Sequence, residues 1–175
     1  MHLSSNVDIS RAAVNYFSNL FSKEDLDARA EERAILDCIP HLVSAEMNEP
    51  LLRPILLPEV EKVVFNMKKG MAPSPDGFLI EFFQEFWEII KLDLLEVVQE
   101  SHRNKQMLKS MNSTFLVLIP KQEGANQLTQ FRPIALCNVV YKIITKLIAE
   151  RLKLLLSTLI SPEQGGFVEG RQNFG

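Results

Sequence analysis

The chain has 175 residues, 46% of them hydrophobic, and a formal net charge of -3. This length and apolar content exclude a chain that is disordered over most of its length. No apolar run approaches the roughly 20 residues that cross a bilayer, and the N-terminus does not have the pattern of a signal peptide, so we expect no membrane partner. Cys38 and Cys137 have no CxxC or histidine neighbour, which indicates buried thiols and neither a disulfide framework nor a zinc site.

The charge is distributed unevenly along the chain. Residues 1–100 carry 9 Lys and Arg against 18 Asp and Glu, a net charge of -9, whereas residues 101–175 carry 10 against 4, a net charge of +6. Only the second part has the balance expected of a surface that contacts phosphates. Chance clustering of solvated charges is the alternative that composition leaves open.

Two helices are predicted near the N-terminus. Apolar residues at helical spacing predict an amphipathic helix over 8–21, with Ser10 as its N-cap. A second, shorter helix is predicted over 30–39, because Pro40 ends the pattern.

The next segment, 41–56, is predicted to be an irregular linker, since Pro50 and Pro54 interrupt any regular pattern. A helix is predicted over 58–69, and Gly70 should end it.

The sequence "APSPDGF", residues 72–78, is typical of a helix start. Ser74 can act as the N-cap, Pro75 suits the first helical position, and Asp76 in the first turn complements the helix dipole. The longest helical pattern follows over 78–104, with a break expected near Asp93.

The apolar period then changes. The run "STFLVLIPK", residues 113–121, predicts a strand that is buried on both faces, and "FRPIALC", residues 131–137, predicts a second strand. A short polar loop joins them, so they should pair as an antiparallel hairpin. An amphipathic helix is predicted over 138–159, with apolar side chains inward and lysines outward.

No self-contained active site is recognisable. The three histidines lie far apart in the sequence, and no phosphate-binding, hydrolase or metalloprotease motif occurs. What remains is a pair of cations: Lys121 ends the first predicted strand and Arg132 begins the second. A Lys and an Arg at one end of a stiff hairpin could clamp a triphosphate. Ordinary surface cations are the alternative.

Several segments together carry a resemblance to a known family. "APSPDGFLIEFFQEFWEIIKLDLL", "STFLVLIPK" and "LTQFRPIALCNVVYKIITKLIAERLKLLLSTLISPEQGGFVEGRQ" occur in this order. They resemble the front of the reverse transcriptase domain of plant LINE-type non-LTR retrotransposons. The upstream "YFSNLF", "IPHLVSAEMNEPLLRPI" and "PEVEKVVFNMKKG" resemble the connector before that domain, so the resemblance covers about residues 8–172.

The resemblance implies a role for several residues. "LIPK" and "FRPIAL" match the fingers hairpin of the family, so Lys121 and Arg132 are expected to face the triphosphate of an incoming deoxynucleotide. An RNA template and a DNA primer are the further partners that the family implies. The residues implied on the template and primer side are Asp76, Gly77, Gln164, Phe167, Gly170 and Arg171.

The chain departs from the family pattern in two ways. The palm aspartates of the family, which bind two Mg²⁺ ions in the intact enzyme, would follow Gly175, and a glycine usually stands where this chain has Ser74. We therefore expect no catalytic residue, no bound metal and no cofactor in this fragment, and the missing palm segment could be a partner. If residue 74 needs positive φ, Ser74 costs about 1 kcal/mol; if it caps a helix, serine is an improvement.

The sequence therefore predicts an α+β chain, mostly helical with one antiparallel β-hairpin, equivalent to the fingers of a right-hand polymerase with the palm missing. Residues 1–57 would form a helical connector and residues 58–175 the fingers part. The expected function is that of a fragment of an RNA-directed DNA polymerase, inactive alone, with a nuclear or cytoplasmic location by resemblance. The alternative is a non-catalytic module derived from a retroelement that binds nucleic acid or protein.

Overall fold

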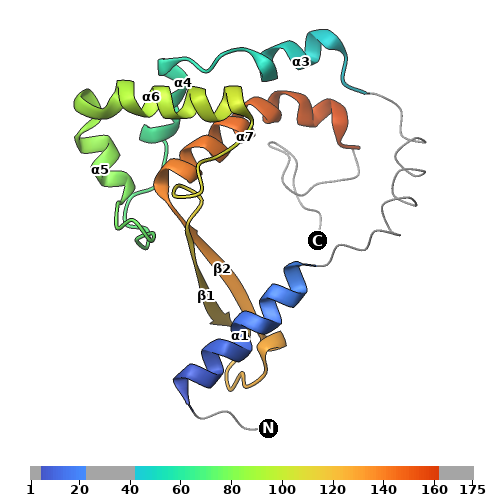
Figure 1. Ribbon diagram of the computed structural model, residues 1–175. Coiled ribbons are helices and arrows are strands. Elements are labelled where there is room, and N and C mark those ends of the chain that lie inside the picture. The colour runs from blue at the N-terminus through green and yellow to red at the C-terminus, as the bar shows by residue number, and fades with distance from the viewer. Residues whose placement is uncertain (1–4, 23–41, 162–175) are drawn as a thin grey trace. The chain divides into compact units, whose positions relative to one another are not determined.

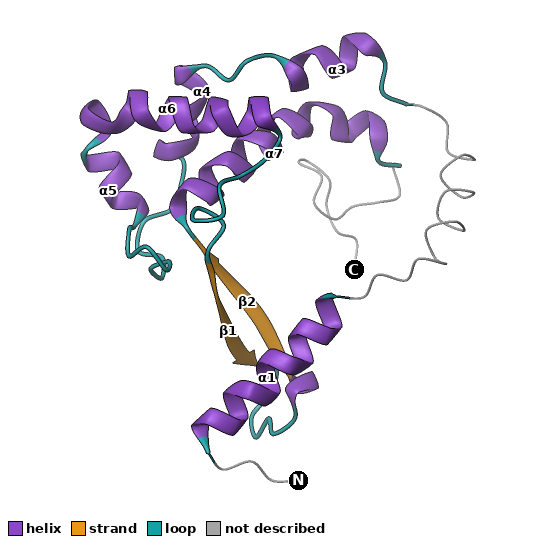
Figure 2. Cartoon of the chain, in the orientation of Figure 1, coloured by secondary structure: helices purple, strands orange, loops and turns teal. Residues whose placement is uncertain are grey.

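The structure, a computed structural model, describes residues 5–22 and 42–161 (Figure 1). Figure 2 shows that this part of the chain is mostly helical, with a single pair of strands. No described helix is long and apolar enough to span a bilayer. The predicted helix over 30–39 lies outside the described residues. The elements are α1 (Asn6–Phe21), α3 (Ala45–Leu52), α4 (Leu57–Phe65), α5 (Ile80–Glu85), α6 (Trp87–Asn104), β1 (Thr114–Pro120), a 3₁₀ turn (Leu128–Gln130), β2 (Phe131–Cys137) and α7 (Val139–Leu159).

The residues group into two compact units by their contacts in space. The first comprises the described residues of Met1–His41 together with Leu118–Pro133, that is, α1 and the tip of the hairpin. The second comprises Leu42–Val117 and the described residues of Ile134–Gly175, and it contains the other helices. Lys121 and Arg132 therefore belong to the first unit, and the segment 72–78, "APSPDGF", belongs to the second.

The hydrophobic core of the second unit is formed by its helices. Helix α4 contacts α5, α6 and α7, and α3 contacts α7. The side chains that are most completely buried come from α4, α6 and α7. They are Val60, Val64, Val98 and Ile143. Each helix thus turns one apolar stripe toward a shared interior, which accounts for most of the stability of such a unit.

Helix α1 confirms the predicted amphipathic helix, but its predicted N-cap is wrong. The backbone N–H of Ile9 donates to the carbonyl of Ser5 (3.0 Å), so the helical hydrogen bonds begin at Ser5 and Ser10 lies inside the helix. Phe17 is the buried residue of this helix, whereas Val14 is largely exposed.

The predicted linker over 41–56 contains a helix, which corrects the prediction. Helix α3 starts after Ser44, whose hydroxyl oxygen accepts a hydrogen bond from the backbone N–H of Met47 (3.2 Å). Pro50 lies inside α3 and removes one helical hydrogen bond. The N–H of Arg53 still donates to the carbonyl of Glu49 (3.0 Å), so the last turn closes despite the proline.

Two other helix boundaries differ from the sequence pattern. Helix α4 ends at Phe65, before Gly70, and the side-chain amide of Gln84 donates to the carbonyl of Val64 (2.8 Å) in its last turn. The long helix predicted over 78–104 is divided at Phe86, which has non-helical backbone angles, and not near Asp93.

The hairpin confirms the predicted pairing of two strands. The N–H of Lys121 donates to the carbonyl of Gln130 (2.8 Å), and the hydroxyl of Thr114 lies 3.4 Å from the sulfur of Cys137. Each strand advances seven residues between these two opposite pairs, so no bulge intervenes. In this register Pro120 and Pro133 occupy positions whose backbone nitrogens point away from the partner strand, where a missing N–H breaks no ladder bond.

The prediction that the first strand is buried on both faces is wrong. Six of the seven residues of β1 are exposed, among them Phe115, Val117 and Ile119. Within the described chain the sheet has two strands only, so its apolar side chains are not covered by neighbouring strands. The apolar composition of the strands predicted extended structure correctly but not its burial.

Candidate nucleic-acid interface

Lys121 and Arg132 lie on one face of the hairpin tip. Because Lys121 is opposite Gln130, Arg132 is opposite Ile119, and alternate residues of a strand share a face. Lys121 and Arg132 are therefore diagonal neighbours on the same face, a relation that puts Cβ atoms about 7–8 Å apart. The structure thus brings together the two cations that the sequence singled out, and their separation suits contacts to one phosphate or to adjacent phosphates.

The two cations differ in how far their hydrogen-bonding capacity is used. The ammonium of Lys121 donates to the carbonyl of Thr129 (2.7 Å), which ties the side chain to the loop and leaves two of its three donors. Arg132 is exposed and makes no hydrogen bond or ion pair within the described residues, so its guanidinium fork can receive an anion. The Gln130 side-chain oxygen accepts from the N–H groups of Asn126 (2.9 Å) and Gln127 (3.0 Å), which stiffens the loop between the cations.

Asp76 and Gly77 form a tight turn, and the predicted helix start at this corner is wrong. The N–H of Gly77 donates to the carbonyl of Ser74 (2.9 Å), and Gly77 has a φ of 77°. The Asp76 carboxylate accepts from the Ser74 hydroxyl (2.8 Å) and from the N–H of Phe78 (3.1 Å). Helix α5 begins only at Ile80. The serine therefore closes a turn rather than capping a helix, because its hydroxyl is used within the turn.

The other residues implied on the template and primer side are not placed by the structure. Gln164, Phe167, Gly170 and Arg171 lie outside the described residues. Asp76 and Gly77 share the turn of the second unit, whereas Lys121 and Arg132 share the hairpin tip of the first.

The described residues do not fit a magnesium pair. Within 5–22 and 42–161 no three His, Cys, Asp or Glu side chains converge as a metal site would require. Cys137 is a free, partly buried thiol, and Cys38 lies outside the described residues. The chemistry accessible to the described hairpin face is anion binding, and no reaction step through a metal is derived for it.

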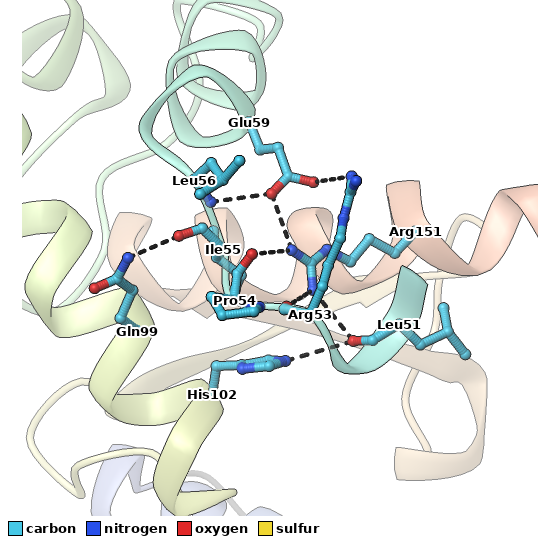
Figure 3. A network of polar contacts seen from close by, with 9 residues as sticks. All are labelled: Leu51, Arg53, Pro54, Ile55, Leu56, Glu59, Gln99, His102 and Arg151. Carbon is cyan, nitrogen blue, oxygen red and sulfur yellow. Dashed lines mark hydrogen bonds and ion pairs between the residues drawn. The ribbon is translucent and has the colours of Figure 1, made fainter. Parts of the chain in front are cut away.

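Sequence reasoning missed the most connected side chain of the second unit, Arg151 of α7. Its guanidinium is buried, and it donates to three backbone carbonyls and to the Glu59 carboxylate (2.9 Å) (Figure 3). Only its Nε lacks a partner among the described residues. The carbonyls belong to Leu51 (3.1 Å), Arg53 (2.6 Å) and Pro54 (3.1 Å). The available signal was its position four residues from the inward Leu147 and Leu155, where a charged side chain requires buried partners.

Glu59 connects this network to the start of α4. One carboxylate oxygen accepts from Arg53 (3.0 Å) and the other from the N–H of Leu56 (3.0 Å) and from Arg151. Burial raises the pKa of Glu59, but the hydrogen bonds from Arg151 and Leu56, the charge of Arg151 and the hydrogen bond from Arg53 together hold that pKa below its ordinary value. The network joins α7 to the segment between α3 and α4.

The described residues form a mostly helical fold with two neighbouring cations, Lys121 and Arg132, on a two-stranded sheet. The chain is similar to the uncharacterized 149 kDa protein of transposon TX1 from Xenopus laevis, with 34% identity over 162 residues. The matched region is 93% of this chain but 12% of the length of that relative. No model of a known protein family matches the chain. The similarity supports a protein derived from a transposable element.

Proposed function

We propose that the chain corresponds to the connector and fingers part of a reverse transcriptase of the LINE-type non-LTR retrotransposons, the plant group that its motifs resemble. Residues 1–57 would be the connector and 58–175 the fingers part. The similarity to a transposon protein supports an origin in a mobile element. The order of hairpin and following helix, β1, β2 and α7, agrees with the motif order on which the resemblance rests.

In this proposal Lys121 and Arg132 contact the triphosphate of a deoxynucleotide or the phosphates of an RNA template paired with DNA. The observation that carries it is the register of the hairpin, which sets both cations on one face. Lysine supplies a point charge with free donors, and arginine supplies a planar fork suited to phosphate oxygens. The net charge of +6 over residues 101–175 favours the same class of ligand.

A second candidate function is a protein-interaction module of retroelement origin. Large apolar side chains are exposed on several elements, including Val14 and Phe21 of α1 and Ile89 and Leu92 of α6. Where exposed apolar side chains form a contiguous patch, they mark a site of protein contact. This candidate predicts a protein partner and no dependence of its binding on Lys121 and Arg132.

The test of the first candidate is equilibrium binding of a fluorescent RNA–DNA hybrid over a salt series. The test variant is Lys121→Gln/Arg132→Gln, and the matched control is Lys68→Gln/Lys109→Gln, which removes two exposed lysines of the second unit. For wild type, log K should fall linearly with log salt. If both cations contact phosphates, the test variant should lose about 1.4–1.8 of that slope, at 0.7–0.9 per phosphate.

The control variant should keep the wild-type slope within error. Binding that does not respond to salt, or an equal loss of slope in both variants, would reject the hairpin face as the phosphate contact. A chain that does not bind the hybrid but captures a protein partner would favour the interaction module.

A further inference from the structure

The second unit contains a cavity of about 780 Å³ that the hairpin does not contribute to. It lies against the end of α3, the end of α6 and the middle of α7, and its size is within the range of about 300–1,000 Å³ typical of small-molecule sites. Half of its lining is apolar and comes from these elements and the segments beside them. Those residues are Leu52, Pro54, Ile55, Met107, Ile144 and Ile148.

One wall of the cavity is held rigidly by hydrogen bonds. In the segment 51–55, the carbonyls of Leu51, Arg53 and Pro54 accept from Arg151, and the carbonyl of Ile55 accepts from Gln99 (2.7 Å) (Figure 3). Because four of the five carbonyls of this segment are already paired, the wall can present apolar side chains to a ligand without leaving those carbonyls unsatisfied. The pattern is that of a preformed site.

The charged side chains of the lining are all of one kind. Among the described residues, the cavity is lined by the cations Arg103 and Lys105 and by His102, and by no Asp or Glu, although the chain has 22 acidic and 19 basic residues. Arg103 lies in the last turn of α6, where a cation also complements the helix dipole. Lys105 lies beyond the last residue of α6 with a left-handed backbone (φ 52°), so the dipole does not account for this second cation. The exposed ends of Arg103 and Lys105 therefore give the cavity a positive rim.

We propose that this cavity binds a small amphipathic anion. Its apolar body would lie against Ile55, Met107 and Ile148, and its carboxylate or phosphate would pair with Arg103 and Lys105. A carboxylate can accept two parallel hydrogen bonds from the Arg103 fork, and a phosphate can accept from both cations. The site is separate from Lys121 and Arg132, so it does not depend on the proposed nucleotide contact.

The experiment uses the whole 175-residue chain with ¹³C-labelled methionine methyl groups. Met107 lines the cavity, whereas Met71 is 56% exposed and does not line it, so each sample contains its own control. The probes are octanoate, octyl phosphate and neutral 1-octanol, which share one apolar chain. We expect the Met107 signal to shift in a saturable way with at least one of the two anions, with 1-octanol at least five-fold weaker and Met71 unmoved.

Two variants separate charge from packing. Arg103→Gln/Lys105→Asn removes the positive rim, and asparagine tolerates the left-handed backbone at 105. It should weaken anion binding at least five-fold and leave 1-octanol unchanged, whereas Lys109→Gln should change neither. The proposal is overturned if neither anion moves Met107, if 1-octanol binds as well as the anions, or if Met71 shifts in parallel. Unchanged chemical shifts of the other methionines show that each variant is folded.

Discussion

Replacing Arg151 by leucine tests whether the buried network joins α7 to the segment before α4. The substitution keeps an apolar side chain of useful size but removes donors from three carbonyls and from the Glu59 carboxylate. Hydrogen bonds from a charged group contribute about 1.5–3 kcal/mol each. Their sum overstates the loss, because Arg53 and Glu59 lie partly in solvent and water can replace some donors. Removing one partner of a buried ion pair typically costs about 3–5 kcal/mol, which we expect for Arg151→Leu.

The assay is urea unfolding followed by the fluorescence of Trp87, the single tryptophan, which is buried in the core of the same unit. Because unfolding free energies of domains are about 5–15 kcal/mol, Arg151→Lys supplies a milder variant that stays measurable. Lysine keeps the positive charge but lacks the planar guanidinium group and its several donors, so we expect Arg151→Lys to lower the unfolding free energy by about 1–3 kcal/mol. Lys146→Gln, on the same helix, should cost at most about 0.5 kcal/mol. A loss below about 1 kcal/mol for Arg151→Leu, or equal losses for Arg151→Leu and Lys146→Gln, would refute the role of the network.

Three further predictions concern the turn and the acid dependence. Ser74→Gly should lower the unfolding free energy by about 1 kcal/mol, because a buried hydroxyl that donates to Asp76 is lost; an increase would mean that a glycine is preferred there. Gly77→Ala should cost about 1–2 kcal/mol through its positive φ alone, since no atom lies within 4 Å of an added Cβ; no change would argue against the turn. Because the folded pKa of Glu59 is lowered, its contribution is present above the ordinary pKa of 4.5 and is lost as pH falls further. Urea midpoints from pH 7 to 3 should therefore fall less in Glu59→Gln than in wild type, and parallel curves would contradict the shift.

The sequence was most informative where one local signal dominated. Apolar spacing located α1, α4 and α7, and the polar loop between two apolar runs located the hairpin, with Lys121 and Arg132 at one end of it. Such signals depend on near neighbours in the chain. The prediction that Lys121 and Arg132 lie at one end of the hairpin followed from them, whereas the face that the two side chains share depends on the register, which the structure supplies.

Several errors arose where contacts that the apolar pattern does not reveal decide local structure. Pro50 suggested an irregular linker, but the cap at Ser44 and packing against α7 keep α3 helical. The side-chain amide that pairs with the last turn of α4 comes from Gln84, twenty residues further along the chain than Val64. The partners of Arg151 lie almost a hundred residues away in the sequence. Its position on an apolar stripe therefore indicates that it needs buried partners but does not predict which residues these are.

Protection of lysines from acetylation tests the central claim most directly. The whole chain would be acetylated in the presence of dTTP or of thymidine, and the modification rate of each lysine read by mass spectrometry. We predict that dTTP, and not thymidine, slows acetylation of Lys121 and that Arg132→Gln reduces this protection, while Lys109 in the same molecules is unaffected. Equal protection of Lys121 and Lys109 by dTTP, or no protection of Lys121, would contradict the assignment of the hairpin face to phosphate binding.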